Sequence, residues 1–556
     1  MVDLAERRPA MLEDEPAPPF SYPIFRNVWM ASMASNFGGL IQGVGAAWLM
    51  VSLGGTATQV ALVQASATLP IMVLSLFAGA IADNLDRRRI MIGAQCFMLV
   101  VSVALSLAAF GDYLTPVSLL LFTFLIGCGT AMNSPSWQAL VGDMVPRPTL
   151  PAAVAMNSMG FNIARSAGPA LGGAIVALAG APAAFAVNAL SYIPLLGVLW
   201  RWERPVAAQA LPRERIGAAM GAGLRYVAAS PRIQMVIARA ALFGLAASGI
   251  PSLLPLIARN LVGGGALTFG ILSGLFGIGA VLGAYVTSKL RAQYPPETKI
   301  RVAMALVAAG AALVGLSRNM PMTMAGLFLA GAGWVAALST FNVSVQMAAP
   351  RWVVGRALSL YQMGTFGAMA AGAWMAGSIA QHFGIPLALY TVSGIMLLGI
   401  VAGLRFPIRY EAGLDLDPAD MWHTPDTLVP IQPRSGPIVI AIHYRIADAD
   451  TMAFLAAMRE RRRIRTRDGA RQWALLRDLG DPDLWIERYK VPSWTDYIRF
   501  NQRRTQADIA NFDEIRQLHR GSWPPEIHRM LEREPDAQAI LPAPPKEPLT
   551  DPGRAS

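Results

Sequence analysis

The sequence contains little charge and few side chains that form disulfides or bind metals. Asp, Glu, Lys and Arg make up 15% of its 556 residues, whereas 54% are hydrophobic, and there are only two cysteines and five histidines. Cys96 and Cys128 lie in long apolar stretches, where a thiol behaves as a small hydrophobic group. This usage excludes a disulfide framework, and histidines so scattered predict no metal site and no cofactor. The apolar surface exceeds what a soluble core can bury and indicates a membrane protein.

Twelve apolar stretches fill the first 406 residues. A helix needs about 20 apolar residues to cross a bilayer, and each stretch comes close to or exceeds that length. We therefore predict an all-α membrane protein with twelve transmembrane helices, near residues 25–53, 58–82, 89–110, 115–142, 150–178, 182–200, 233–258, 266–288, 300–317, 320–348, 356–381 and 385–406.

Arginine and lysine gather in the loops on one side of these stretches. The opposite loops offer only Arg259 and Arg318. Basic loops stay on the cytoplasmic side, so both termini are predicted to be cytoplasmic. This asymmetry accounts for most of the net charge of +11, so no nucleic-acid partner is expected. Residues 1–20 are acidic and rich in proline, which predicts a disordered tail rather than a secretory signal.

The two halves of this region repeat each other at an offset of 204 residues. Transporters are commonly built from repeats with the substrate site between them. We predict two parallel six-helix repeats, at residues 21–200 and 233–408. Residues 201–232 are the linker between them and include an amphipathic segment from Arg215 to Val227. The superposed pairs are Gly79 with Gly283, Arg87 with Arg291, Pro146 with Pro350 and Arg147 with Arg351.

Two motifs resemble those of the major facilitator superfamily. The loop after the second stretch matches the family pattern at Gly79, Asp83, Arg87 and Arg88, although Asn84 and Asp86 depart from it. The segment Gly168-Pro169-Ala170-Leu171-Gly172-Gly173 is similar to the GPxxGG motif of drug and proton antiporters, with Ala155 and Ala164 replacing the preceding glycines. The resemblance implies a secondary transporter of small molecules in a lipid bilayer, with protons as a candidate partner.

The loop motif predicts a conformational latch. Asp83 is expected to face the partial positive charge of the helix N-terminus near Gly355 and Arg356, and Asp143 is a second acidic candidate. The alternative is that Arg87 to Arg89 only fix the topology. The second motif predicts that a slightly bent helix packs closely on its neighbour at Gly168, Pro169, Gly172 and Gly173. This contact is either a hinge on which the helices rock or a packing contact alone.

Arg165 is the strongest candidate for the substrate pathway. It lies halfway along the fifth stretch, where an arginine is expensive unless it has a partner or a function. With Asn157 and Asn162 it could bind an anionic or polyphenolic group; a structural hydrogen bond is the alternative. Arg239 either contributes to the pathway or extends its side chain to the interface. Asn36 is a further candidate and belongs to a stripe of small and polar residues with Ser32, Gly39, Gly43 and Ala46. The other candidates are polar or aromatic residues inside the stretches, for which hydrogen bonding between helices is the alternative: Asn133, Trp137, Gln138, Trp334, Asn342 and Gln346.

A deep carboxylate for proton coupling is missing from the predicted spans. Asp83 and Asp143 fall at cytoplasmic ends, and Asp112 falls in an external loop. Proton antiport therefore follows from the resemblance alone, while uniport and coupling through the loop carboxylates remain alternatives.

A soluble region follows at residues 437–532, after a linker at 409–436. Its pattern predicts strands at 437–446, 471–479, 484–491 and 527–531 and helices at 450–465 and 495–518, a small ferredoxin-like α+β cytoplasmic domain. The basic run from Arg459 to Arg463 is expected on a solvated or lipid-headgroup face. His443, Trp473 and Trp485 are candidates for a pocket, with core packing as the favoured alternative. Residues 533–556 are predicted to be disordered.

The soluble region resembles antibiotic-biosynthesis monooxygenases, which implies dimerisation as a candidate role. Together with the membrane part, it is similar to the transmembrane secretion effector branch, whose relatives include an enterobactin exporter. The favoured interpretation is an exporter of a small amphipathic metabolite, a siderophore or a drug-like compound, in a bacterial inner membrane. The alternatives are a membrane-tethered enzyme, with the soluble domain modifying a delivered molecule, and uptake instead of export.

Overall fold

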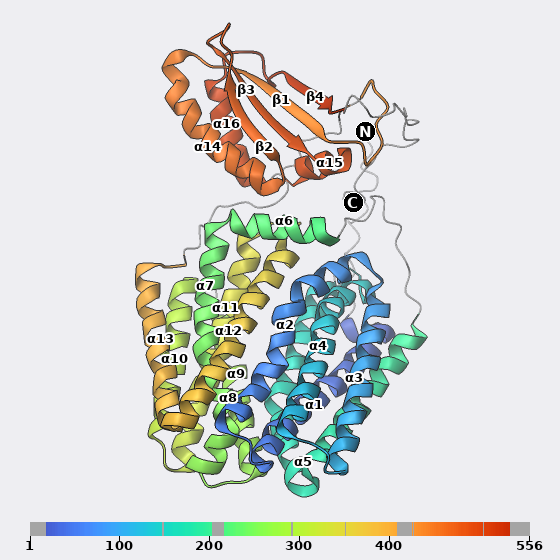
Figure 1. Ribbon diagram of the computed structural model, residues 1–556, viewed down its shortest axis with the longest axis vertical. Helices are drawn as coiled ribbons and strands as arrows, with labels where there is room; N and C mark the ends of the chain where they lie inside the picture. Colours follow the sequence, from blue (N-terminus) through green and yellow to red (C-terminus); the bar gives the residue numbers. More distant parts are fainter. Residues whose placement is uncertain are drawn as a thin grey trace, which may run out of the picture.

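A computed structural model describes residues 18–146, 149–202, 216–290, 293–350, 352–408, 425, 427–503 and 505–533. The side chains of Asp83, Gln138 and Asn162 lie outside this described part, as do most of the predicted terminal tails and much of the two linkers. The chain forms a helical body with a small α+β region above it, which we call the tail (residues 427–533) (Figure 1).

The first half consists of long helices joined by short turns. Thr56 and Thr115 form capping boxes that satisfy free N–H groups at the starts of α2 and α4. Gly180, at φ 79°, breaks α5 into two consecutive helices, which agrees with the two stretches predicted there. After a short 3-10 turn at Pro19–Ser21, the helices are α1 (Pro23–Ser52), α2 (Ala57–Asn84), α3 (Arg87–Phe110), α4 (Pro116–Met144) and α5 (Leu150–Arg201).

The second half repeats this pattern after the linker helix α6 (Ile216–Ala228), which coincides with the predicted amphipathic segment. The stretch predicted at 233–258 is built from two consecutive helices and a π-turn. Nine helices in the described residues are long and apolar enough to cross a membrane. The elements are α7 (Pro231–Ala247), α8 (Gly249–Leu256), η3 (Ile257–Leu261), α9 (Ala266–Lys289), α10 (Pro296–Leu316), α11 (Met320–Ala348), α12 (Val354–Phe383) and α13 (Ile385–Arg405).

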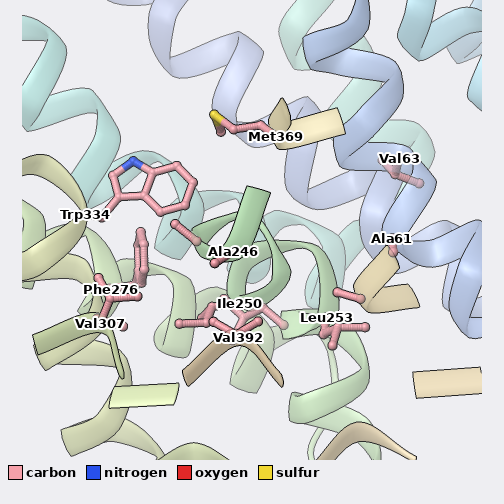
Figure 2. Packing of buried hydrophobic residues seen from close by; sticks show 14 of the residues in the cluster. Ala61, Val63, Ala246, Ile250, Leu253, Phe276, Val307, Trp334, Met369 and Val392 are labelled. Carbon is pink, nitrogen blue, oxygen red and sulfur yellow. The ribbon is translucent and has the colours of Figure 1, made fainter. Parts of the chain in front are cut away.

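The two halves meet along two helix pairs, α2 with α12 and α5 with α9. At one end of the first pair the Thr58 hydroxyl donates to Gln381 at 2.6 Å, and at the other the Ser75 hydroxyl donates to the Ser359 carbonyl at 3.3 Å. Below we call the membrane face that carries α6 the tail side. The buried hydrophobic cluster continues from one half into the other, where α2 contacts α8 and Ala61 lies near Leu253 (Figure 2).

The tail is a four-stranded antiparallel sheet with helices on one face (Figure 1). The strand order is β2-β3-β1-β4, and Tyr444 of β1 packs on Phe454 of α14 in the tail core. One prediction was wrong, because the helix expected over 495–518 is two helices that meet near Thr505, which caps the second. The elements are β1 (Ile438–Arg445), a 3-10 turn (Asp448–Asp450), α14 (Thr451–Asp468), β2 (Arg471–Arg477), β3 (Leu484–Val491), α15 (Trp494–Gln502), α16 (Gln506–Leu518) and β4 (Ile527–Leu531).

Candidate functional site

Arg165 and Trp334, two of the predicted pathway residues, meet across the halves. The guanidinium carbon of Arg165 on α5 lies 6.0 Å from the centre of the Trp334 ring on α11, at the outer limit for a cation–π contact. Trp334 is 5% exposed and is held edge-on by Phe243 of α7 and Phe276 of α9 (Figure 2). The arginine of one half thus faces an aromatic cluster of the other.

Small residues bring α5 and α9 together at this point. A β-carbon at Gly277 would lie 2.7 Å from the Arg165 carbonyl oxygen, and the Ser166 hydroxyl donates to the Gly277 carbonyl at 3.3 Å. Farther from the tail side, a β-carbon at Gly173 would lie 2.5 Å from the Cα of Gly270. Backbones can approach this closely only where side chains are absent, so the glycines set the position of Arg165.

The GPxxGG segment contacts two helices at once. Gly168 faces Leu40 and Gly172 faces Ile41 on α1, whereas Gly173 faces α9 of the other half. α5 is therefore wedged between a partner in its own half and one across the interface. Pro169 is half-buried between these contacts.

One face of α1 borders open space. A carbon added at Gly39 or Gly43 would meet no atom within 4 Å, and Asn36 on the same stripe is half-buried. The ends of the predicted stripe, Ser32 and Ala46, are buried. Asn157, on the tail side of Arg165, is also half-buried.

Other predicted pathway residues are not brought to Arg165. Asn133 accepts a hydrogen bond from Gln95 of α3 at 3.3 Å, within one half. Gln346 donates to Asn342 one turn away on α11. Trp137 packs against a hydrophobic cluster at the start of α1. Only the Asn133 contact is the interhelical bonding that the sequence analysis gave as the alternative.

Arg239 does not extend to the membrane surface. Its side chain is 4% exposed, and its guanidinium pairs with Glu297 of α10 at 3.3 Å and donates to the Phe406 carbonyl at 3.1 Å. The N–H of Ile408 donates to the same glutamate at 2.9 Å. A buried charge needs such partners, so the pair ties α7, α10 and the end of α13 together. Glu297 was not among the predicted site residues, because it lies three residues before the stretch predicted at 300–317, whereas α10 begins at Pro296.

A pocket of about 1000 Å³ opens beside this ion pair. Its walls come from the end of α9, the start of α10 and the polar face of α11, including Glu297, Arg301 and Thr340. It lies within the second half and does not include Arg165 or Trp334. The candidate site at Arg165, in contrast, has residues of both halves in contact.

The arginines of the loop motif bind within the first half. Arg87 pairs with Asp143 of α4 at 3.3 Å, and Arg88 donates to the carbonyls of Leu199 and Trp200 at the end of α5. The Asp143 contact seen here therefore joins α3 to α4 rather than one half to the other. Across the halves, a β-carbon at Gly79 would lie 3.0 Å from the Ser359 hydroxyl of α12.

The tail rests on the linker helix and on the loop before α12. Arg467 of α14 lies 5.5 Å from the Tyr226 ring of α6, Arg503 lies 4.3 Å from the Trp352 ring, and these two rings meet edge-on at 5.5 Å. A β-carbon at Gly223 would press on the side chain of Arg356 at 2.6 Å. The junction therefore contacts both the linker between the halves and the start of α12.

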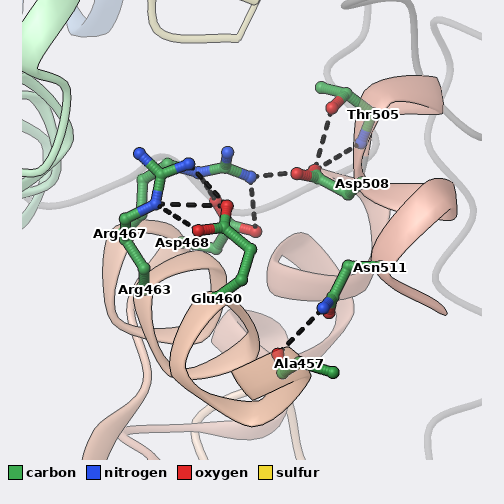
Figure 3. A network of polar contacts seen from close by, with 8 residues as sticks. All are labelled: Ala457, Glu460, Arg463, Arg467, Asp468, Thr505, Asp508 and Asn511. Atoms are coloured by element: carbon green, nitrogen blue, oxygen red, sulfur yellow. Dashed lines mark hydrogen bonds and ion pairs between the residues drawn. The ribbon is translucent and has the colours of Figure 1, made fainter. Parts of the chain in front are cut away.

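Carboxylates hold the arginine of this junction in place. Arg467 pairs with Asp468 and with Asp508 at 2.8 Å each, and Asp508 also accepts from Thr505 (Figure 3). Burial alone would raise the pKa of Asp508, but Arg467 and the hydrogen bonds from Thr505 outweigh burial and lower it. The junction is therefore charged and pre-oriented toward Tyr226.

The predicted tail pocket does not form from its three residues. Trp485 is in the core on the helix-covered face of the sheet, whereas His443 belongs to the opposite face, because neighbouring Tyr444 points inward. Trp473 donates to Glu487 at 3.0 Å. The expected solvated basic run also needs correction, since Arg461 is 4% exposed and lies 3.8 Å from Glu487.

A family comparison matches almost the whole chain. The model of the transmembrane secretion effector family covers residues 15–536. The chain belongs to this family. It is therefore a multi-pass membrane transporter of the major facilitator type and acts on small molecules, a role that requires no enzymatic chemistry from its helices.

Individual relatives are transporters as well. Over 156 residues the chain is 30% identical to a staphyloferrin A transporter of Staphylococcus aureus (strain NCTC 8325 / PS 47), covering 28% of this chain and 39% of that protein. It is 23% identical to the multidrug efflux pump Tap of Mycolicibacterium fortuitum, over 67% of this chain and 94% of the pump.

The solved structure of a bacterial homologue of the human lysosomal transporter Spinster, inward-facing and unoccupied, shares the fold. It has a TM-score of 0.58 and 15% identity, over 71% of this chain and 99% of that one.

One buried polar cluster in this transporter was missed. The side-chain nitrogen of Asn188, on the second part of α5, shares its two N–H groups among Gln42 of α1 and, at 3.2 and 3.1 Å, Ser102 of α3 and Tyr192. All four are nearly or fully buried, so the cluster joins three helices of the first half. Gln42 and Asn188 each lie inside an apolar stretch of the sequence, and this could have indicated a buried polar cluster.

Proposed function

We propose that the chain is a secondary active exporter of a small amphipathic anion, with two six-helix halves, twelve spans in all, working by alternating access. The observation that carries the proposal is Arg165 of the first half facing Trp334 of the second at the close crossing of α5 and α9. A planar guanidinium beside an indole offers both charge-assisted hydrogen bonds and an apolar surface. A site divided between the halves changes when they rock.

The packing supports an arrangement that opens toward the tail side. Away from the tail, the halves are joined where Arg259 donates to the Val51 carbonyl at 3.1 Å and Trp48 stacks on Phe269 at 6.3 Å. Over their whole lengths α4 packs mainly on α2 and α3 and α11 mainly on α9 and α10, whereas α2 and α12 keep the halves in contact at the tail side through Ser75 and Ser359. With the termini in the cytoplasm of a bacterial cell, we propose an inward-facing state in which α4 and α11 separate to admit the cargo from inside.

The relatives support a small organic cargo. Their names include a staphyloferrin A transporter, a multidrug efflux pump and a gallate transporter of Pseudomonas putida. Gallate is a polyphenolic carboxylate, the chemistry that an arginine beside an aromatic ring suits. We place the cargo among siderophores and related phenolic or carboxylate compounds, as in the enterobactin-exporter branch, and include proton antiport in the proposal.

Flux into inverted membrane vesicles tests this. We expect uptake of catecholate or lipophilic anionic compounds to depend on a pH gradient and to fall at least about tenfold in Arg165→Ala, since losing one charge-assisted pair is worth about 1.5 to 3 kcal/mol. Arg165→Lys should retain charge with weaker, non-planar binding, and Arg318→Ala, an exposed loop arginine, is the matched control. Unchanged transport of every anionic compound in Arg165→Ala would refute the substrate site.

For the tail we propose a ferredoxin-like domain that regulates the transporter through its contacts with α6 and Trp352, with dimerisation as a further role. The antiparallel order β2-β3-β1-β4 supports that fold. Deleting residues 412–556 separates this from the fused-enzyme alternative. Regulation predicts that transport persists with altered rate, whereas an obligatory modifying enzyme predicts that export of the unmodified compound stops.

A further inference from the structure

Two histidines and a glutamate converge on the outer face of the tail sheet. In the β1–β4 ladder Ala441 pairs with His528 and Ile442 with Ile527, which places Glu526 opposite His443. The N–H of His443 accordingly donates to the Glu526 carbonyl at 3.0 Å. Residues two apart on a strand share a face, so Glu526 and His528 both stand beside His443.

Their donor atoms are close enough to share one ion. Glu526 lies 3.5 Å from Nδ1 of His443 and 3.0 Å from Nε2 of His528, and the two imidazole centres are 4.8 Å apart. One ligand atom from each residue lies within 4.8 Å of the others. Ligands of tetrahedral zinc, with bonds of about 2.0 to 2.1 Å, are separated by about 3.3 Å. Side-chain rotation at these partly exposed positions closes the difference.

The chemistry of the three donors selects the class of ion. Two neutral imidazoles and one carboxylate suit a divalent metal of intermediate softness and leave a fourth position for water. Nearby Arg445 is paired with Asp481 at 3.1 Å, and Lys490 with Glu532. Exposed pairs between histidine and glutamate contribute little stability, so folding alone gives little reason for this convergence.

We propose that His443, Glu526 and His528 form a binding site for Zn²⁺ or a similar divalent transition metal. This proposal goes beyond transport and departs from the expectation that the histidines are too scattered for a metal site. β4 is a five-residue strand at the edge of the sheet, and two of the three ligands belong to it or to the residue before it. Bound metal would therefore clamp this edge strand to β1.

The test uses the full chain, purified without a polyhistidine tag, stripped with a chelator and dialysed against Zn²⁺, with Co²⁺ as a spectroscopic probe. We expect about one ion per chain and visible Co²⁺ absorption typical of four-coordinate nitrogen and oxygen ligation. His443→Ala and His528→Ala should abolish binding, and Glu526→Gln should weaken it at least about tenfold. His382→Ala, a histidine of α12 outside the cluster, should bind as the unchanged chain does.

A second readout follows the clamp. Zn²⁺ should slow amide hydrogen exchange in β4 of the unchanged chain and leave it unaltered in His528→Ala, which also shows that the variant is folded. The absence of saturable binding, or equal stoichiometry in His528→Ala, would overturn the proposal.

Discussion

Glu487 is the most consequential buried charge of the tail, and replacing it with glutamine should destabilise this region strongly. The residue is fully buried, and its carboxylate is 2.9 Å from Arg465 and accepts from Tyr444 at 3.0 Å. Arg461 and Arg465 are themselves 4% and 2% exposed. The neutral glutamine would leave both guanidinium groups buried without a counter-charge.

The magnitude follows from two independent arguments. Breaking a buried ion pair by removing one partner costs about 3 to 5 kcal/mol. Burial alone would raise the pKa of Glu487, but Arg465 and Arg461 outweigh burial and lower it from 4.5 to about 2. A difference of this size corresponds to about 3 kcal/mol. Because the folded-state pKa is the lower one, this contribution is complete above pH 4.5 and is lost as the pH falls toward 2.

Pulse proteolysis of the full chain in urea, followed through the tail fragment, measures this loss. With an m-value of about 1 to 3 kcal/mol per M, the tail midpoint should fall by about 1 to 5 M in Glu487→Gln. Glu460→Gln is the control, because Glu460 pairs with Arg463 on the exposed side of α14, where such pairs contribute less than about 1 kcal/mol. Equal midpoints for the two variants would refute the reasoning.

Two further predictions concern the membrane part and the junction. Gly173→Ala places a methyl group against the α9 backbone, an overpacking cost of about 1 to 3 kcal/mol, and should shift the conformational equilibrium away from this state about 5- to 150-fold. Double electron–electron resonance between labels on the two halves measures this shift. Gly43→Ala is the control: its methyl group meets no atom within 4 Å, so the distance distribution should not change. Arg467→Ala removes the cation above Tyr226 and should speed hydrogen exchange in α6 at least about fivefold. Arg463→Ala is the control, because Arg463 pairs with Glu460 on the same helix, and it should leave this exchange unchanged. Equal exchange in the two variants would contradict the proposed docking.

Local sequence patterns predicted the elements well because each depends on its own residues. The length of the apolar stretches alone placed most predicted helix ends within a few residues of the observed ones. The break between α15 and α16 was missed because Thr505 caps a new helix inside an otherwise continuous amphipathic pattern. The twelve-span count, the latch and the pathway roles stay predictions.

The sites were harder to predict because they depend on which faces meet. Arg165 and Trp334 were each candidates, but no periodicity could place one above the other across two halves. Arg239 appeared free to reach the interface because Glu297, on another helix, was not considered. The three metal-ligand candidates depend on strand register, which fixes the facing residues only once the pairing is known.

The bond from Arg88 to the end of α5 has a consequence for how the protein is made. The guanidinium donates to carbonyls 111 and 112 residues later in the chain. At about 5 to 20 residues per second, the ribosome needs about 6 to 22 s to supply that partner. During this time Arg88 must be satisfied by water or lipid headgroups, so the first half can close only after its final helix has been inserted.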